Sequence, residues 1–287
     1  MIIDKIINNN IVSSIDDKGI EVVVMGRGLG FKCKPGQQMD DTKIEKIFRM
    51  ESNEELQRLQ SVLADIPLEN IQVCNEIIAF AGNVITNKLS KNIYITLTDH
   101  INFAIKRKEE GIHFTNALQW EIKKFYHQEY MVGLKAVELI KQKIGVDLDE
   151  DEAASIALHF VNAELGTEMP NTIDITKLIQ NVLKIIMYHF QINIIEDTLN
   201  YERFITHLRF FSQRIVTNKF IHGEEEEFYK IIKMQYPSAY ECARKIRTYV
   251  EKEYKVPLPE EEMIYLTIHI TRILNDYKGE SGLTIEK

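Results

Sequence analysis

Four histidines recur at matched places in the larger part of this 287-residue chain. His100 and His207 stand in similar segments, and His159 and His269 stand in another pair of similar segments. The two offsets along the chain are nearly equal, 107 and 110 (207 − 100 and 269 − 159). Each ring lies among apolar residues that share one face of a predicted helix. A polar ring kept at two matched positions in two copies, within apolar faces, favours a function, because burying a polar group costs free energy.

Several kinds of chemistry use histidines in such a setting. One such residue alone is usually a hydrogen-bonded structural histidine. A metal site would require an H-x-x-x-H pair or a cysteine at ligand spacing, and the sequence offers neither beside these histidines. For acid–base catalysis, the sequence shows no nucleophile motif and no Gly-rich phosphate loop beside these histidines. The remaining role is phosphoryl acceptor, since a neutral imidazole can attack a phosphoryl donor. The product gains about −1.5 to −2 charge units, which must pair with Arg or Lys or push a surface apart. Arg203, Arg209 and Arg272 lie within one turn of His207 and His269.

A second group of residues stands near the N-terminus. Asn8, Asn9 and Asn10 offer amide donors and acceptors at a turn, Arg27 projects from a Gly-rich turn, and Phe31 offers an aromatic face. Amides, an arginine and a stacking ring are what recognition of single-stranded or bulged RNA requires. The alternative is ordinary hairpin chemistry, with Asn and Gly in turns and Phe in a core.

The elements that carry these residues differ in kind. Residues 1–34 predict four short strands in one antiparallel meander, with Phe31 beginning the last strand. From about Thr42 the apolar period becomes helical, with Ile44, Ile47 and Phe48 on the first helix. An acidic stretch opens the predicted helix before each of the two downstream histidines, at 147–152 and at 257–262. The prediction is a small antiparallel sheet followed by two homologous all-α helical bundles.

Composition narrows the class of protein. The net charge is −8, but residues 1–39 hold five Lys/Arg against four Asp/Glu, so the rest carries −9 (30 − 39). Any contact with RNA is therefore expected in the N-terminal segment. Cys33, Cys74 and Cys242 are isolated, which argues against a disulfide framework or a zinc site. No signal peptide or membrane-spanning segment is predicted, so we expect a cytoplasmic protein without membrane insertion.

The motifs resemble those of the BglG/SacY transcriptional antiterminators, most nearly the LicT type. The matching segments are 8–10 (Asn-Asn-Asn), 24–31 (Val-Met-Gly-Arg-Gly-Leu-Gly-Phe), 97–104 (Leu-Thr-Asp-His-Ile-Asn-Phe-Ala) and 157–164 (Ala-Leu-His-Phe-Val-Asn-Ala-Glu). The resemblance covers the whole chain. It implies a dimeric RNA-binding domain that holds a leader mRNA hairpin and prevents an overlapping terminator from forming upstream of sugar-utilisation genes, with β-glucosides the expected sugar.

The resemblance also implies the site residues and partners. The RNA-contacting residues would be Lys5, Asn8, Asn10, Gly26, Arg27 and Phe31. The phosphorylated residues would be His100, His159, His207 and His269. A sugar-specific phosphotransferase-system permease (enzyme II) would inhibit through the first pair, and the phosphocarrier protein HPr would activate through the second. The protein would be a homodimer and not an enzyme, with no cofactor and no metal.

Domain boundaries follow from the duplication and the resemblance. We expect an RNA-binding domain at 1–56, a first phosphotransferase-system regulation domain at 57–170 and a second at 171–287, joined near Pro170. Two other functions stay open. A DNA-binding activator with the same regulatory domains would begin with a helix-turn-helix, and a helical phosphohistidine carrier would pass its phosphoryl group on.

The first prediction concerns the N-terminal segment. Residues 1–56 alone should bind a leader RNA hairpin as a dimer, and Arg27→Ala should weaken that binding strongly, because arginine contacts phosphate and base edges together. Gel-shift titration with the hairpin and with a scrambled RNA of equal length measures both. Equal affinity for the two RNAs would show the interpretation of this segment to be wrong.

Overall fold

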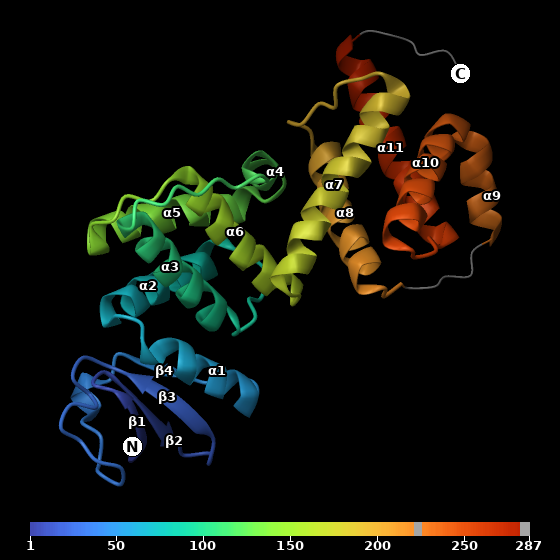
Figure 1. Ribbon diagram of the computed structural model, residues 1–287. Helices are drawn as coiled ribbons and strands as arrows, with labels where there is room; N and C mark the ends of the chain where they lie inside the picture. Colours follow the sequence, from blue (N-terminus) through green and yellow to red (C-terminus); the bar gives the residue numbers. More distant parts are fainter. Residues whose placement is uncertain (221–225, 282–287) are drawn as a thin grey trace. The chain divides into compact units, whose positions relative to one another are not determined.

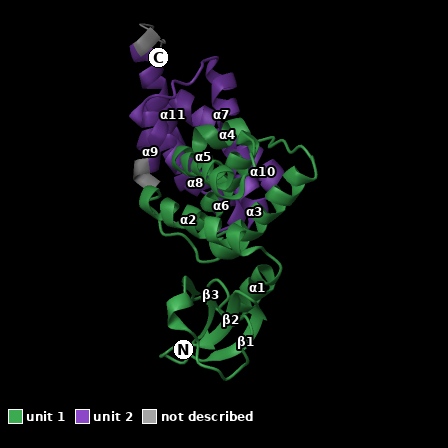
Figure 2. Ribbon diagram, turned by 90° about the vertical axis from the view of Figure 1, so that its left-hand side faces the viewer, with its two compact units in different colours: residues 1–167 green, residues 168–287 purple. Residues whose placement is uncertain are grey.

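The computed structural model describes residues 1–220 and 226–281. The chain divides into two compact units, residues 1–167 and 168–287, which Figure 2 colours separately. The first unit contains a small sheet and a helical bundle, and the second contains a helical bundle (Figure 1). The predicted fold class, a small antiparallel sheet followed by two homologous all-α bundles, is therefore confirmed.

The N-terminal sheet is an antiparallel meander in the order β1-β2-β3-β4. Its strands are β1 (Ile3–Asn8), β2 (Ile11–Ile15), β3 (Glu21–Met25) and β4 (Lys46–Phe48). The β2–β3 turn is closed by Asp16, whose carboxylate accepts hydrogen bonds from the amides of Lys18 and Ile20 at 2.9 and 3.1 Å. In residues 1–52, all of which the structure describes, there is no α-helix, and so no helix-turn-helix.

The fourth strand is not where the sequence placed it. Phe31 lies in a tight turn, where its amide donates to the carbonyl of Gly28 at 3.2 Å. The segment predicted to begin a helix forms a short 3-10 turn, Asp41–Lys43, and then β4. Ile47 and Phe48 pack on opposite faces of the sheet, against separate apolar clusters. Neighbouring apolar residues thus reflect a strand covered on both sides, and the helical interpretation was wrong.

Both faces of the sheet are covered within one chain. Helix α1 (Asn53–Ala64) covers one face with three leucines, Leu56, Leu59 and Leu63. Leu29 and Met39, from the segment between β3 and β4, cover the other face. Ser52 caps α1 by accepting a hydrogen bond from the Glu55 amide at 3.2 Å. Each face of the sheet therefore packs against another part of the same chain.

Five helices form the first bundle: α2 (Leu68–Val84), α3 (Ile93–Glu109), α4 (Gln119–Phe125), α5 (His127–Ile144) and α6 (Glu150–Leu165). The apolar stripes of α2, α3, α5 and α6 meet in one core, which includes Ile77, Ile101, Ala136 and Phe160. Helix α5 ends at Gly145, which adopts φ +83°, a left-handed conformation that glycine accommodates without strain. The core holds α3 and α6, the helices that carry His100 and His159, side by side.

The second bundle repeats this order with α7 (Met169–Phe190), α8 (Leu199–Thr217), α9 (Glu226–Gln235), α10 (Pro237–Tyr254) and α11 (Glu260–Ser281). Pro170, predicted to be the joint, stands in the first turn of α7. A tyrosine contact also repeats, at the offset that separates His159 from His269. Tyr130 donates to Glu150 at 3.2 Å and Tyr240 donates to Glu260 at 2.7 Å. The structure therefore extends the duplication from the sequence to side-chain contacts.

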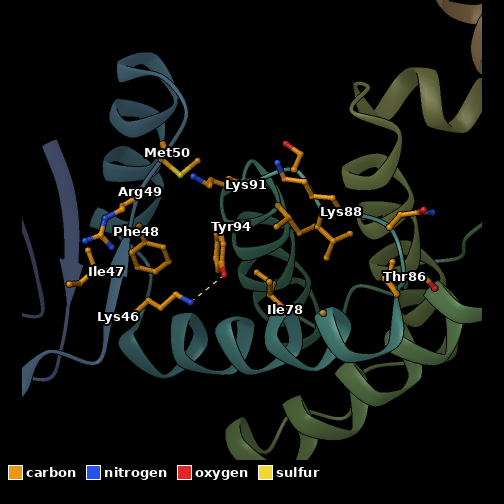
Figure 3. Close-up of a pocket in the computed structure, with 16 residues that line it drawn as sticks. Lys46, Ile47, Phe48, Arg49, Met50, Ile78, Thr86, Lys88, Lys91 and Tyr94 are labelled. Atoms are coloured by element: carbon orange, nitrogen blue, oxygen red, sulfur yellow. Dashed lines mark hydrogen bonds between the residues drawn. The ribbon is translucent and has the colours of Figure 1, made fainter. Parts of the chain in front are cut away.

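The sheet contacts the first bundle through β4 (Figure 3). A hollow of about 680 Å³ lies between β4 and the α2–α3 segment, with Lys88 and Lys91 on its rim. Lys46 of β4 donates to the Tyr94 hydroxyl of α3 at 3.3 Å, the dashed line of Figure 3. The Phe48 and Tyr94 rings pack edge to face, with centroids 5.4 Å apart. The sheet is thus tied to the N-terminal turn of the helix that carries His100.

None of the helices described here is both long enough and apolar enough to cross a membrane.

Close helix packing in the first bundle yields a stability prediction. Gly133 of α5 lies against α6 so closely that an added Cβ would overlap the carbonyl of Ala153. Gly133→Ala should lower the free energy of unfolding by about 1–3 kcal/mol through overpacking. A Cβ added at Gly82 of α2 would meet nothing within 4 Å, so Gly82→Ala should raise the free energy of unfolding by about 0.5–1 kcal/mol. Urea unfolding measures both. Similar changes in the two variants would contradict this account of α5–α6 packing.

Candidate functional site

The first histidine pair lies between α3 and α6. The ring centroids of His100 and His159 are 4.6 Å apart, with an angle of 38° between the planes. Ile101 and Phe160, the residues that follow the two histidines along their helices, are fully buried. The fold therefore brings together two histidines that stand on separate helices, far apart in the sequence.

A buried glutamate stands beside this pair. Glu152, in the first turn of α6, forms an ion pair with Arg107 of α3, and its Oε2 lies 3.5 Å from His100 Nε2. Burial raises the pKa of the Glu152 carboxyl, but His100 and Arg107 outweigh burial and hold that pKa below its usual range. The guanidinium of Arg107 also lies over the Phe114 ring, 4.2 Å from its centroid. The charge on Glu152 is thus compensated inside the bundle.

The second pair repeats the arrangement between α8 and α11. The rings of His207 and His269 are stacked with centroids 4.7 Å apart. Arg214 holds Glu262 through two hydrogen bonds, Nε to Oε1 at 2.6 Å and Nη2 to Oε2 at 2.9 Å. Aromatic rings surround the pair, with Phe204 5.6 Å from His269 between centroids. Both bundles therefore contain two adjacent histidines and one arginine–glutamate pair that links the same two helices.

Burial keeps three of the four paired rings neutral. It lowers the pKa of His159 well below the usual value, and the charge on His100 lowers it further. Burial, followed by the charges of His269 and Arg214, lowers the pKa of His207 to about 3. Burial and the nearby Arg272 lower the pKa of His269 to about 4. At pH 7 these three rings are unprotonated, which is the form that can attack a phosphoryl donor.

The surroundings fit a phosphoryl acceptor better than a proton relay. The Nδ1 atoms of His159, His207 and His269 are buried without a hydrogen-bond partner among the described residues. A histidine that serves as general base is normally oriented by a carboxylate through its second nitrogen. Within residues 1–220 and 226–281, no group of three or more His, Cys, Asp or Glu could hold a metal ion.

The arginine–glutamate pairs were not assigned a role from the sequence. Arg214 follows Arg107 at the same offset by which His207 follows His100, and Glu262 follows Glu152 as His269 follows His159. That shared offset was the signal that could have found them. The arginines that the sequence suggested as phosphate partners are differently placed: Arg203 and Arg272 are exposed, and Arg209 is half-buried.

The N-terminal candidates gather at one end of the sheet. The amide of Gly26 donates to the Asn10 carbonyl at 2.9 Å, and the Gly28 amide donates to the Asn10 side chain at 2.8 Å. An added Cβ on Gly26 would overlap the carbonyl of Lys43, and one on Gly30 would overlap that of Asn8. Only glycine permits these close approaches, so the Gly-rich segment positions Arg27 beside the asparagine turn.

The other candidates differ in exposure. Phe31 is 56% exposed, and the Lys32 ammonium lies 5.3 Å from its ring centroid. An exposed ring with a neighbouring cation suits base stacking. Arg27 is exposed and forms an ion pair with Glu69 at 3.1 Å. Lys5 lies within β1, paired in register with Ser13, and no hydrogen bond or ion pair joins it to the others in the described structure.

Comparison with known proteins identifies both parts of the chain. Residues 1–57 match the family model of the CAT RNA binding domain. Residues 75–163 and 180–273 each match the PRD domain. Each PRD match contains one histidine pair, and the CAT match contains all six RNA-contact candidates.

Full-length relatives share this arrangement. The chain is 46% identical over 274 residues to the transcription antiterminator LicT of Bacillus subtilis (strain 168), covering 96% of this chain and 99% of LicT. It is 42% identical over 282 residues to the beta-glucoside operon antiterminator of Dickeya chrysanthemi, covering 98% and 100%. The crystal structure of GlcT CAT-PRDI matches 57% of this chain and 97% of its own, with a TM-score of 0.50 and 31% identity.

The lowered pKa values predict how stability responds to pH. The unfolded chain takes up protons on these histidines near pH 6.5, whereas folded His207 and His269 do so only near pH 3 and 4. The free energy of unfolding should therefore fall as the pH falls from 6.5 towards 4. His207→Asn combined with His269→Gln should lose less stability over that range than the parent protein. Urea midpoints at pH 7 and pH 4.5 test this, and equal losses in both proteins would refute it.

Proposed function

Because this chain belongs to the family of transcription antiterminators that join a CAT RNA-binding domain to two PRD domains, we propose that it binds a hairpin in a leader transcript and thereby prevents the terminator from forming. Transcription then continues into the sugar-utilisation genes. The name of the Dickeya relative supports a β-glucoside as the inducing sugar. The observation that supports phosphorylation control is the adjacent histidine pair in each bundle, 4.6 and 4.7 Å between centroids.

RNA recognition is proposed for the turn at one end of the sheet. Asn10 organises the turn, Gly26 permits its close packing, and Arg27 and Phe31 offer a guanidinium and a ring to the RNA. Asn8 and Lys5 complete the proposed contact set. Arginine can pair bidentately with phosphate, and an exposed aromatic ring stacks on unpaired bases.

We assign opposite signals to the two bundles. The sugar-specific permease would phosphorylate His100 and His159 and inhibit the protein, whereas HPr would phosphorylate His207 and His269 and activate it. A phosphoryl group brings about two negative charges into a site of neutral, closely packed rings. In the second bundle Arg214 already gives two hydrogen bonds to Glu262, so the added charge would compete with Glu262 for Arg214, recruit another arginine or reorganise the helices.

The remaining proposals concern assembly and location. The protein would act as a homodimer in the cytoplasm, without a cofactor. Arginine–phosphate pairs within or between subunits would hold the second bundles in the arrangement that favours RNA binding. The domain limits 1–56, 57–170 and 171–287 remain our prediction, beside a division of the structure into units at 167/168.

A reporter placed behind the leader and its terminator tests this function in cells that lack HPr. His207→Asp with His269→Asp places negative charge at both rings and should allow transcription of the reporter. His207→Ala with His269→Ala removes both rings without adding charge and should leave the reporter largely silent. His100→Asp in cells that contain HPr should lower expression. If the doubly acidic and doubly Ala proteins were equally inactive, charge at the second pair would not be the activating signal.

A further inference from the structure

The turn that carries Arg27 is attached to the first regulatory bundle. The Arg27 guanidinium Nη2 lies 3.1 Å from Glu69 Oε1, in the first turn of α2. The Arg27 amide donates to Glu45 Oε1 at 3.1 Å. The other oxygen of Glu45 accepts a hydrogen bond from Gln72 of α2 at 2.6 Å. The sheet turn is thus held to α2 directly through one carboxylate and indirectly through another.

Asn8 is engaged in the same region. Its side-chain amide donates to the carbonyls of Leu63 and Ala64, both at 3.1 Å. These carbonyls belong to the last turn of α1, where helices leave acceptors without internal partners. The Asn8 side-chain oxygen accepts from the Asn10 amide at 2.8 Å. Both N–H groups of the Asn8 side-chain amide are therefore engaged by the end of α1, so this nitrogen can donate to RNA only if the end of α1 moves away.

The carboxylate of Glu69 offers Arg27 what an RNA phosphate would offer, a pair of anionic oxygens within hydrogen-bond reach. The two side chains are 69% and 55% exposed. An ion pair this exposed contributes little to stability and exchanges readily with another anion. Glu69 also stays stabilised when Arg27 leaves, because a negative charge in the first turn of a helix interacts favourably with the helix dipole. Exchange of Glu69 for phosphate therefore has a low cost.

We propose that Glu69 competes with RNA for Arg27, so that the placement of the α2 N-terminus on the sheet sets the affinity for RNA. This inference rests on the proposed role of Arg27 in RNA binding. Glu69 is a positioning residue in this account and does not itself contact RNA. Because α2 shares its apolar core with α3 and α6, the competitor belongs to the bundle that carries His100 and His159. Linkage then requires that RNA binding, in turn, favours bundle arrangements in which Glu69 is away from Arg27.

The test uses the full chain and a matched pair of variants. Glu69→Gln removes the competing charge. Glu76→Gln removes the same charge two turns further along α2, where Glu76 pairs with Lys143 at 2.8 Å instead of Arg27. Both changes remove one negative charge from α2, so the comparison controls for the change in net charge, and repeating it without Arg27 isolates the ion pair. The probe is a fluorescent hairpin from the leader transcript of the neighbouring sugar-utilisation genes, with a scrambled hairpin of equal length as reference.

Glu69→Gln is expected to bind the hairpin about two- to fivefold more tightly than Glu76→Gln, the range that an exposed ion pair supports. In an Arg27→Ala background the two variants should bind equally. Equal affinities of the single variants with Arg27 present, or a difference that persists without Arg27, would overturn the proposal. If Arg27→Ala alone left hairpin affinity unchanged, the proposed RNA contact itself would fail, and the competition with it.

Discussion

Three of the four paired histidines, His159, His207 and His269, lie in surroundings that favour the neutral imidazole. The ring centroids of each pair lie within 5 Å of each other, and burial lowers the pKa of His159, His207 and His269. A group in such a site can accept a phosphoryl group only if the site then changes, because about two new negative charges cannot remain unpaired in an apolar interior. Under the proposed phosphorylation, the packing that keeps these rings neutral would also require the helices around them to rearrange.

In each bundle an arginine–glutamate ion pair ties together the two helices between which the histidines lie. Arg107 with Glu152, and Arg214 with Glu262, join the same two helices that carry the histidines in each bundle. The copies differ in detail, since Glu152 lies near His100 whereas Glu262 is held by two hydrogen bonds from Arg214. Related bundles can therefore respond differently to the same chemical signal. The contacts of β4 with Tyr94, and of Arg27 with Glu69, connect the first bundle to the RNA-binding sheet.

Much of this could be predicted from the sequence because the signals are periodic. The duplication located all four histidines, and it also carried the arginine–glutamate pairs, whose offsets were visible although no role was assigned to them. The fourth strand could not be predicted by the same logic. Adjacent apolar residues such as Ile47 and Phe48 do not fit a strand with one face open to solvent, and they therefore favoured a helix. In the structure both faces of the sheet are covered, one of them by α1, which lies outside the sheet. The pairing of Arg27 with Glu69 could not be predicted either, since nothing local relates a turn in the sheet to a helix 42 residues later.

The most direct measurement is RNA affinity of one purified sample before and after phosphorylation by phospho-HPr. The account predicts that stoichiometric phosphorylation increases hairpin affinity, and that the increase disappears when His207 and His269 are both replaced by Asn, which leaves neutral side chains that cannot accept the phosphoryl group. An unchanged affinity after phosphorylation, or an equal increase in the Asn variant, would contradict the claim that charge at the half-buried second pair controls RNA binding.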